Sequence, residues 1–232
     1  MIEALRSGDI EIQGRLVDAS NATLYCSLTA GAETCAVVYK PIRGERPLWD
    51  FPDGTLAHRE VASYAVSVAT GWDVVPPTVL RDGPLGPGMV QLWIDVDEAV
   101  DLVELVSTDH PALRRMALFD AVVNNADRKG GHLLPVPGGH VYGVDHGVTF
   151  SAEPKLRTVL WGWRGRRFAD EELAVLTALR WDLTSGALGE ELAALLAPEE
   201  VAATVDRVDR LLSTRRFPYP SPDWPAVPWP PF

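Results

Sequence analysis

The character of the sequence changes near Ile94, and this change limits the possible folds more than any other feature. Before it, short runs of β-branched and aromatic residues alternate with turn residues, and one helix-like stretch at 56–70 interrupts them. After it, an acidic connector at 95–101 leads into apolar stretches of helical period. A chain of 232 residues can form one large domain or two small lobes that share a cleft. We therefore expect an α+β protein with a β-rich first lobe, one main helix in it, and a mostly helical second lobe.

The predicted elements follow from periodicity and from turn residues. Besides the helix at 56–70, helices are expected at 112–124, 171–181 and 190–212. Strands are expected at 10–17, 23–28, 35–39, 74–80 and 88–94, with short ones at 132–134 and 140–142. The expected lobes are residues 1–95 and 96–216.

A tail at 217–232 follows the last predicted helix. It holds seven prolines and two tryptophans in sixteen residues, so we expect an extended conformation. Its aromatic residues favour docking on the body of the protein. Upstream, the segment 155–167 is basic and contains Trp161 and Trp163, which either pack in the helical lobe or receive an anionic substrate.

The formal net charge of -11 restricts the partners of the chain. It argues against nucleic acid, and against an anionic membrane, bound over a broad surface. No apolar run approaches the length of a transmembrane helix, and the first residues lack the features of a signal peptide. Cys26 and Cys35 lie in neighbouring predicted strands, where two reduced thiols are the favoured interpretation. We expect a cytoplasmic protein without stable membrane insertion and without a nucleic-acid partner.

Two acidic residues stand in loops directly beside apolar sequence, namely Asp127 and Asp145. Earlier in the chain, Lys40 ends a predicted strand just before Pro41, and Glu60 lies in the helix at 56–70. Phosphoryl transfer needs a lysine on the phosphates, an acid that holds this lysine, a carboxylate for the acceptor hydroxyl and ligands for a metal ion. Each residue alone has an ordinary explanation, such as a surface turn or an exposed helix position. Their order along the chain predicts an ATP site.

These residues resemble the phosphatidylinositol 3- and 4-kinase family, and most closely the type II phosphatidylinositol 4-kinases and related bacterial proteins. The resemblance rests on Asn-Asn-Ala-Asp127-Arg128, on Gly-Val-Asp145-His-Gly, and on Tyr-Lys40-Pro followed by Glu60, and it spans roughly residues 10–150. It implies a bilobal protein-kinase-like fold. It also implies transfer of the γ-phosphate of ATP to a hydroxyl, with Mg²⁺ or Mn²⁺ as the metal ion.

The resemblance assigns catalytic roles by position. Lys40 would contact the phosphates with Glu60 as its partner, and Asp127 would orient or deprotonate the acceptor hydroxyl. Asp145 would be the main metal ligand. His132 stands where the family has a metal-binding Asn, and an imidazole suits Mn²⁺ better than Mg²⁺.

The resemblance also assigns the contacts to the nucleotide. The stretch 18–23 would cover the phosphates; because it is not glycine-rich, Ser20 and Asn21 would supply side-chain donors. A hinge strand would meet adenine through its backbone, and its residues are Gln91, Leu92, Trp93 and Ile94.

Three functions remain open at this stage. The first is a kinase whose acceptor is a protein or a small molecule more readily than a membrane lipid. The second is a nucleotide-binding pseudokinase that acts as a sensor or scaffold, which the two departures at His132 and at 18–23 would permit. The third is an enzyme on the same site that transfers AMP.

Overall fold

An antiparallel sheet of five strands forms the first part of the chain, in a computed structural model that describes residues 1–16 and 21–232. Its strands are β1 (Asp9–Arg15), β2 (Leu24–Ala30), β3 (Glu33–Pro41), β4 (Thr78–Gly83) and β5 (Gly86–Leu92). Their spatial order is β1-β2-β3-β5-β4, so β5 pairs with both β3 and β4. All five were predicted within a few residues of their bounds.

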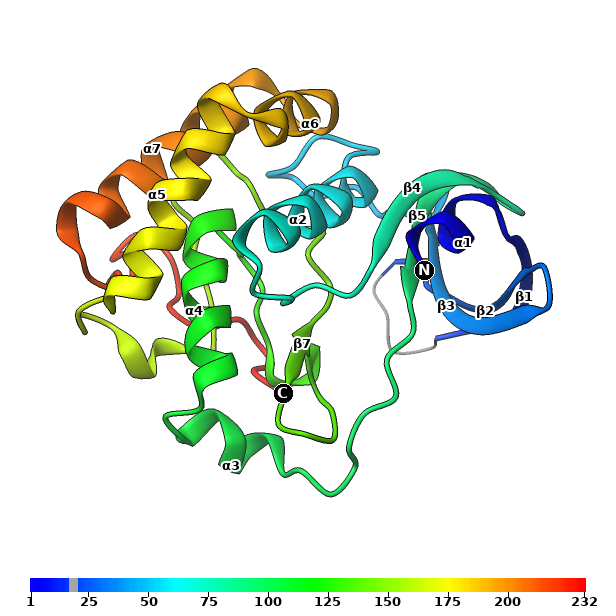
Figure 1. Cartoon of the computed structure of the whole chain (residues 1–232), viewed down its shortest axis with the longest axis horizontal. Helices are drawn as coiled ribbons and strands as arrows, with labels where there is room; N and C mark the ends of the chain where they lie inside the picture. Colours follow the sequence, from blue (N-terminus) through cyan, green and yellow to red (C-terminus); the bar gives the residue numbers. More distant parts are fainter. Residues whose placement is uncertain (17–20) are drawn as a thin grey trace.

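The sheet curls around a short N-terminal helix, α1 (Ile2–Ser7), as Figure 1 shows. Leu5 of α1 is fully buried and packs with Cys26, Val37 and Tyr39, which alternate along β2 and β3 toward the same face. The sequence did not predict α1, because six residues are too few for a helical period to be visible.

Helix α2 (Leu56–Thr70) has the bounds that the sequence predicted. It ends at Gly71, whose φ of +64° is a left-handed conformation that glycine adopts without a steric penalty. Its buried apolar residues Ala62, Ala65 and Val66 belong to the core of the helical half and not to the core of the sheet. Helix α2 is therefore fastened to the second half of the molecule.

The second half begins after an extended connector and is mainly helical. Its helices are α3 (Leu102–Ser107), α4 (Pro111–Val123), α5 (Asp170–Ser185), α6 (Ala187–Leu195) and α7 (Pro198–Thr214). A two-stranded sheet of β6 (Leu133–Pro135) and β7 (Val141–Gly143) follows α4, and a 3₁₀ turn spans Trp161–Trp163. The whole is a mixed α+β structure with a β-rich first part, as expected.

The single helix predicted at 190–212 is wrong. Ala197 is extended and Pro198 begins a new helix, so the stretch contains α6 and α7. Proline is favoured in the first turn of a helix and excluded from its interior, which makes Pro198 the local cause of the break.

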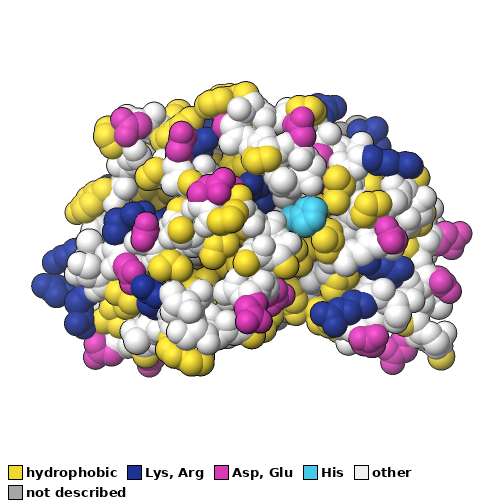
Figure 2. Space-filling model, turned by 90° about the horizontal axis from the view of Figure 1, so that it is seen from above, with side chains coloured by type: hydrophobic (Ala, Val, Ile, Leu, Met, Phe, Trp, Pro, Cys, Tyr) yellow, Lys and Arg dark blue, Asp and Glu magenta, His cyan; other side chains and the backbone are white. Residues whose placement is uncertain are grey.

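The surface carries a mixture of charged and apolar side chains. On the face that Figure 2 shows, acidic and basic side chains are interspersed with apolar ones. Among the described residues, every helix is too short or too polar to span a bilayer.

Candidate active site

Lys40 lies at the end of β3 and joins both halves of the molecule. Strand alternation turns Val37 and Tyr39 into the sheet core and Lys40 toward the opposite face. Its Nζ lies 2.6 Å from Glu60 Oε1 and 2.9 Å from Asp145 Oδ1. Three residues that the sequence grouped from distant segments therefore meet at the ammonium of Lys40.

Burial and the neighbouring charges shift the pKa values of all three groups in this cluster. Burial disfavours the Lys40 ammonium, but the carboxylates of Asp145 and Glu60 outweigh this and raise the pKa of Lys40. The positive charge of Lys40 lowers the pKa of Asp145, against the opposing effect of burial. Burial raises the pKa of Glu60, and Lys40 opposes that rise. Asp145 is the most exposed member, with 47% of its side chain open to solvent.

Glu60 is held in place by α2 and by the loop that follows β7. It is almost fully buried, and its second oxygen, Oε2, accepts the backbone N–H of His146 at 2.9 Å. One carboxylate thus fixes both the lysine and the loop that carries Asp145.

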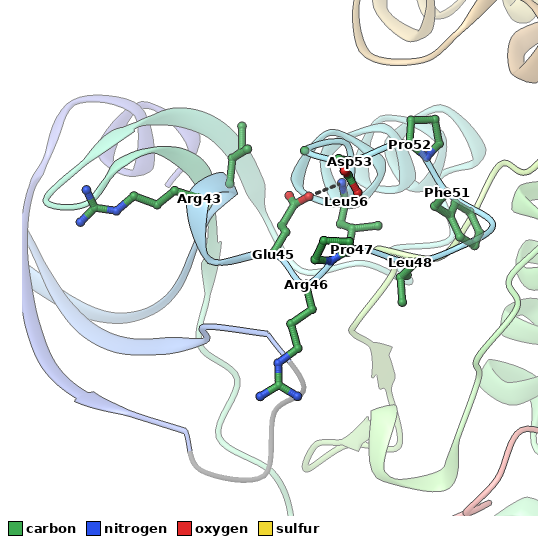
Figure 3. Close-up of a pocket in the computed structure, with 11 residues that line it drawn as sticks. Arg43, Glu45, Arg46, Pro47, Leu48, Phe51, Pro52, Asp53 and Leu56 are labelled. Carbon is green, nitrogen blue, oxygen red and sulfur yellow. Dashed lines mark hydrogen bonds between the residues drawn. The ribbon is translucent and has the colours of Figure 1, made fainter.

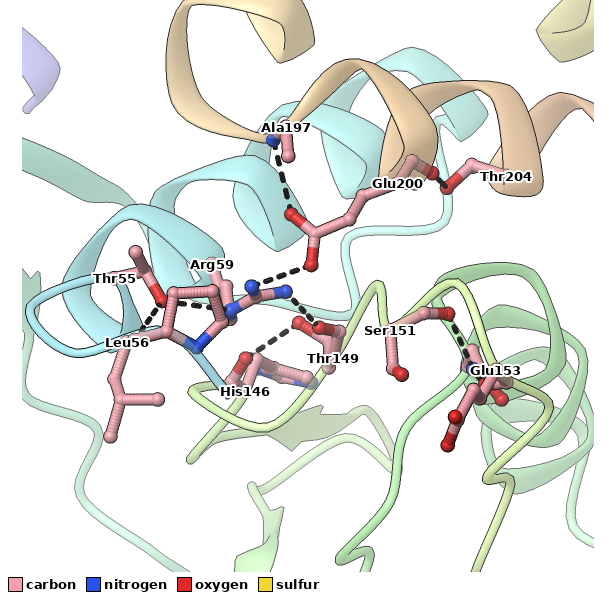
Figure 4. A network of polar contacts seen from close by, with 12 residues as sticks. Thr55, Leu56, Arg59, His146, Thr149, Ser151, Glu153, Ala197, Glu200 and Thr204 are labelled. Atoms are coloured by element: carbon pink, nitrogen blue, oxygen red, sulfur yellow. Dashed lines mark hydrogen bonds and ion pairs between the residues drawn. The ribbon is translucent and has the colours of Figure 1, made fainter. Parts of the chain in front are cut away.

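Arg59, the neighbour of Glu60, binds α2 to the helical half through hydrogen bonds and an ion pair (Figure 4). Its guanidinium donates from Nη1 to the carbonyl of Thr149 at 2.7 Å and from Nη2 to Glu200 Oε1 at 2.6 Å. Arg59 is 1% exposed and Glu200 is 8% exposed, so this ion pair between α2 and α7 is buried. The position of Glu60 therefore depends on α7, far along the chain.

The loop between β3 and α2 supplies the N-terminal cap of α2 (Figure 3). Glu45 accepts the backbone N–H groups of Leu56 at 3.1 Å and of Ala57 at 2.9 Å. A carboxylate at this end satisfies free N–H groups and complements the helix dipole. The same loop borders a small cavity of about 240 Å³.

The loop after α4 is organised by a buried ion pair that the sequence analysis missed. Asp120 in α4 is fully buried and accepts bonds from Arg128 Nε at 3.0 Å and Nη2 at 2.9 Å. Arg128 also donates to the carbonyl of Val144 and contacts the ring of His146. Asn125 donates to Asp120 and accepts the N–H of Asp127. The signal for this network was a single acid inside the apolar helix 112–124, which needs a buried partner.

Asp127 is positioned by this network and remains partly exposed. Its Oδ2 lies 3.1 Å from Lys129 Nζ, and its side chain is 30% exposed. A carboxylate so placed can accept a proton from a bound hydroxyl.

Asp145 and His132 are the two candidate metal ligands. The backbone of Asp145 is left-handed, with a φ of +61°, and its Oδ2 lies 3.5 Å from His132 Nε2. Burial lowers the pKa of His132, which favours the neutral imidazole that can bind a metal ion. Among the described residues, no group of three or more His, Cys, Asp and Glu gathers. If these two residues held a divalent ion, water and phosphate oxygens would have to supply its remaining ligands.

A cleft of about 710 Å³ lies beside these residues. Its lining includes Lys40, Asp145 and His132, and also Val38 and Val144. This volume falls within the range of small-ligand sites.

The predicted hinge residues line one wall of this cleft. Gln91 is buried and its amide donates to Thr78. The N–H groups of Leu92 and Trp93 already donate to Pro77 and Ala36. Backbone N–H donors to a purine would therefore come from Ile94 or the residues that follow it.

The predicted phosphate-covering stretch is described only in part. Ser20 lies outside the described residues. Asn21 lines the cleft, and its Oδ1 accepts the backbone N–H of Arg46 at 2.8 Å.

Comparison with curated proteins finds a relative along nearly the whole chain. Protein Rv2133c of Mycobacterium tuberculosis (strain ATCC 25618 / H37Rv) is 43% identical over 263 residues, covering 98% of this chain and 94% of the relative. No family model matches the chain.

Comparison with solved structures finds kinases. The Golgi casein kinase superposes with a TM-score of 0.59 at 14% identity, covering 92% of this chain and 74% of that one. The proinflammatory kinase CtkA of Helicobacter pylori superposes with a TM-score of 0.53 at 10% identity, covering 92% and 94%. The predicted kinase-like fold is thereby confirmed. Similarity at sequence identities this low shows the fold alone, so the narrower resemblance to phosphatidylinositol kinases stays a prediction.

Proposed function

We propose, from the premise that this chain belongs to the family of protein Rv2133c and has a kinase-like fold, that it is an ATP-dependent phosphotransferase. The observation that carries the proposal is the contact of Lys40 with both Glu60 and Asp145 at one end of the 710 Å³ cleft. Phosphoryl transfer uses a lysine for the phosphates and a carboxylate for the metal, and here one contact joins them.

Each residue takes a defined part in the reaction. Lys40 binds the phosphates, and Glu60 holds Lys40 while a phosphate oxygen replaces Asp145 as its second partner. The acceptor oxygen forms a bond to the γ-phosphorus, the bond from that phosphorus to the bridging oxygen of ADP breaks, and ADP leaves with the electron pair. The proton of the acceptor hydroxyl passes to Asp127.

Asp145 and His132 would hold the divalent ion, either Mg²⁺ or Mn²⁺. A bound ion supplies positive charge that offsets the charge developing on the phosphate oxygens. The protein would contribute two ligands to the ion, and Lys40 would add a second positive charge to the same phosphates.

The narrower assignment is to the phosphatidylinositol 3-/4-kinase-like group. It is supported by the sequence motifs Asp127-Arg128 and Asp145-His146-Gly147, between which Arg128 contacts the ring of His146. A protein or small-molecule hydroxyl is favoured over a membrane lipid, because the net charge of -11 opposes an anionic bilayer. We propose a cytoplasmic location on the same grounds of charge and reduced thiols.

The test uses labelled ATP and two variants. Lys40→Ala and Asp145→Ala should each abolish transfer of the γ-phosphate with either metal, because each removes a group that touches the phosphates or the ion. Asp206→Ala is the matched control, since Asp206 is exposed on α7. Undiminished transfer in either variant contradicts the proposal. Mass analysis of the product distinguishes an added phosphate from an added AMP.

A second candidate is a nucleotide-binding pseudokinase. The observation that favours it is His132, an imidazole in the place of a metal-binding amide. ATP-dependent stabilisation without any consumption of ATP would support this candidate over an active enzyme.

A further inference from the structure

The tail at 217–232 runs alongside the segment that follows Asp145 and ends on the catalytic loop. Phe217 exchanges two backbone hydrogen bonds with Gly165 and Arg166, each 3.0 Å long. Farther along, the carbonyl of Ala226 accepts the N–H of Thr158 at 3.1 Å and Nε1 of Trp161 at 2.7 Å.

The last tail contact is made with the loop of Asp127 itself. The carbonyl of Pro231 accepts the N–H of Gly130 at 2.8 Å. A Cβ on Gly130 would lie 2.0 Å from the ring of Phe232, so only glycine leaves room for this ring. The catalytic loop and the tail are thus fitted to each other.

Lys155 anchors the middle of the tail. It is 3% exposed, and its Nζ lies 3.1 Å from Asp50 Oδ2 and 4.9 Å from the ring centroid of Trp224. Trp224 in turn stacks on Trp49, with 6.2 Å between ring centroids. Undocking the tail would remove the cation–π contact of Lys155 with Trp224, which stabilises the ammonium where it is shielded from water. One lysine therefore ties the tail to the β3–α2 loop and to the segment after Asp145.

An extended polypeptide binds by pairing with free backbone groups and by filling side-chain pockets. Beside the catalytic loop, the N–H groups of Gly130 and Thr158 already have tail carbonyls as partners. The prolines of the tail also reduce the entropy that docking costs, because they restrict the free segment. These features favour a permanent wall over a displaceable cover.

Resting on the proposed kinase activity, we propose that the tail is a fixed wall beside the catalytic loop, where the pairing of Gly130 and Thr158 with the tail leaves these N–H groups unavailable to an extended polypeptide acceptor. The acceptor hydroxyl that Asp127 receives then belongs to a small polar molecule.

The experiment compares the full chain with the double variant Trp224→Ala/Phe232→Ala, and with Phe232→Ala alone in case the double variant does not fold. Trp229→Ala is the matched control, because Trp229 is a tail tryptophan that is 85% exposed. Two acceptors are offered with labelled ATP: dephosphorylated casein, and the small-molecule filtrate of a mycobacterial extract. Hydrogen exchange at Gly130 and Thr158 reports whether the tail is docked.

We expect the wild type and Trp229→Ala to label compounds in the filtrate and to leave casein unlabelled. In the double variant, exchange at both amides should accelerate and labelling of the filtrate should fall about tenfold, with little change in the KM for ATP.

Labelling of casein by the wild type, or a gain of about tenfold in casein labelling on release of the tail, overturns the inference and makes the tail a cover over a protein-acceptor groove. If the wild type shows no Lys40-dependent consumption of ATP with either acceptor, the proposed function itself fails.

Discussion

Lys40 is the residue at which the two halves of the molecule meet, because its ammonium contacts Glu60 of α2 and Asp145 of the second half. In this arrangement Lys40 forms an ion pair with Asp145, the carboxylate that would also bind the metal ion. In the proposed reaction, binding of nucleotide would redistribute charge: phosphate would take the place of Asp145 at Lys40, and Asp145 would turn to the ion. The arrangement is self-consistent without ligand because each charge has a partner.

His132 should decide the choice of metal. Imidazole is a softer ligand than an amide oxygen, so the wild type should work better with Mn²⁺ than with Mg²⁺. His132→Asn should shift the ratio of the two rates toward Mg²⁺ by about tenfold. Initial rates with each ion measure this, and His140→Asn, outside the cleft lining, is the control. If the ratio of the rates with Mn²⁺ and Mg²⁺ did not change, His132 would not be a ligand of the metal ion.

The two thiols should differ in reactivity. Cys26 is fully buried, and burial raises the pKa of its thiol from 9.0 to about 11, whereas Cys35 is half-buried. A disulfide reagent near neutral pH should therefore titrate Cys35 in the folded protein and Cys26 only after unfolding.

The raised pKa of Cys26 should also make the stability of the protein depend on pH. Between pH 9.0 and about 11 the unfolded chain loses the Cys26 proton while the folded protein keeps it. The free energy of unfolding should therefore fall as pH rises through this range and be unaffected below it. Denaturation of Cys26→Ala alongside the wild type checks this, since the variant lacks this dependence.

Among single residues, sequence reasoning found those whose chemistry is visible in isolation. Lys40 before a proline, Glu60 in a helix and Asp145 before His-Gly could be picked by type and order, and the structure brings them into contact. The contacts of Arg128 with Asp120 and with His146 could not be predicted, because they exist only once the fold brings the three residues together. Arg128 resembled a surface turn residue until the fold placed it, fully buried, on Asp120.

At the scale of elements, α2 depends on a partner that lies 141 residues later in the chain, because Arg59 binds Glu200. Glu200→Gln should destabilise the protein by about 3 kcal/mol, since it leaves a buried guanidinium without its counter-charge. It should also raise the KM for ATP, because Glu60 follows Arg59 on the same helix. Glu199→Gln, on the exposed side of the same turn, is the matched control. Urea denaturation and ATP kinetics measure the two effects, and equal stability of the two variants would contradict this account.

Elements were predictable where a local pattern was long enough. The fifteen residues of α2 show a full apolar stripe and end in Gly71, so both bounds followed from the sequence. Helix α1 is only six residues long, and its place is set by the curl of the sheet around Leu5. The break between α6 and α7 carried a local signal in Pro198, which the apolar period of the surrounding stretch outweighed.

At the scale of the whole molecule, ATP with a metal ion should stabilise the fold by linkage. At about one hundred times its Kd, a ligand that binds only the native state adds about 2.7 kcal/mol to the free energy of unfolding. Thermal unfolding should therefore shift upward with ATP and Mn²⁺ or Mg²⁺. The shift should vanish in Lys40→Ala and persist in Asp206→Ala. An equal shift in Lys40→Ala would place the nucleotide elsewhere.

The molecule has two separate apolar cores, one within the curled sheet and one among the helices, and α2 contributes its buried residues to the second. Helix α2 also touches β4 and β5, so these contacts and the ion pair of Lys40 with Glu60 together join the sheet to α2. In the proposed reaction, an opening of the cleft that separated the sheet from α2 would have to break this ion pair, and a variant that lacks it should therefore release ADP at a different rate.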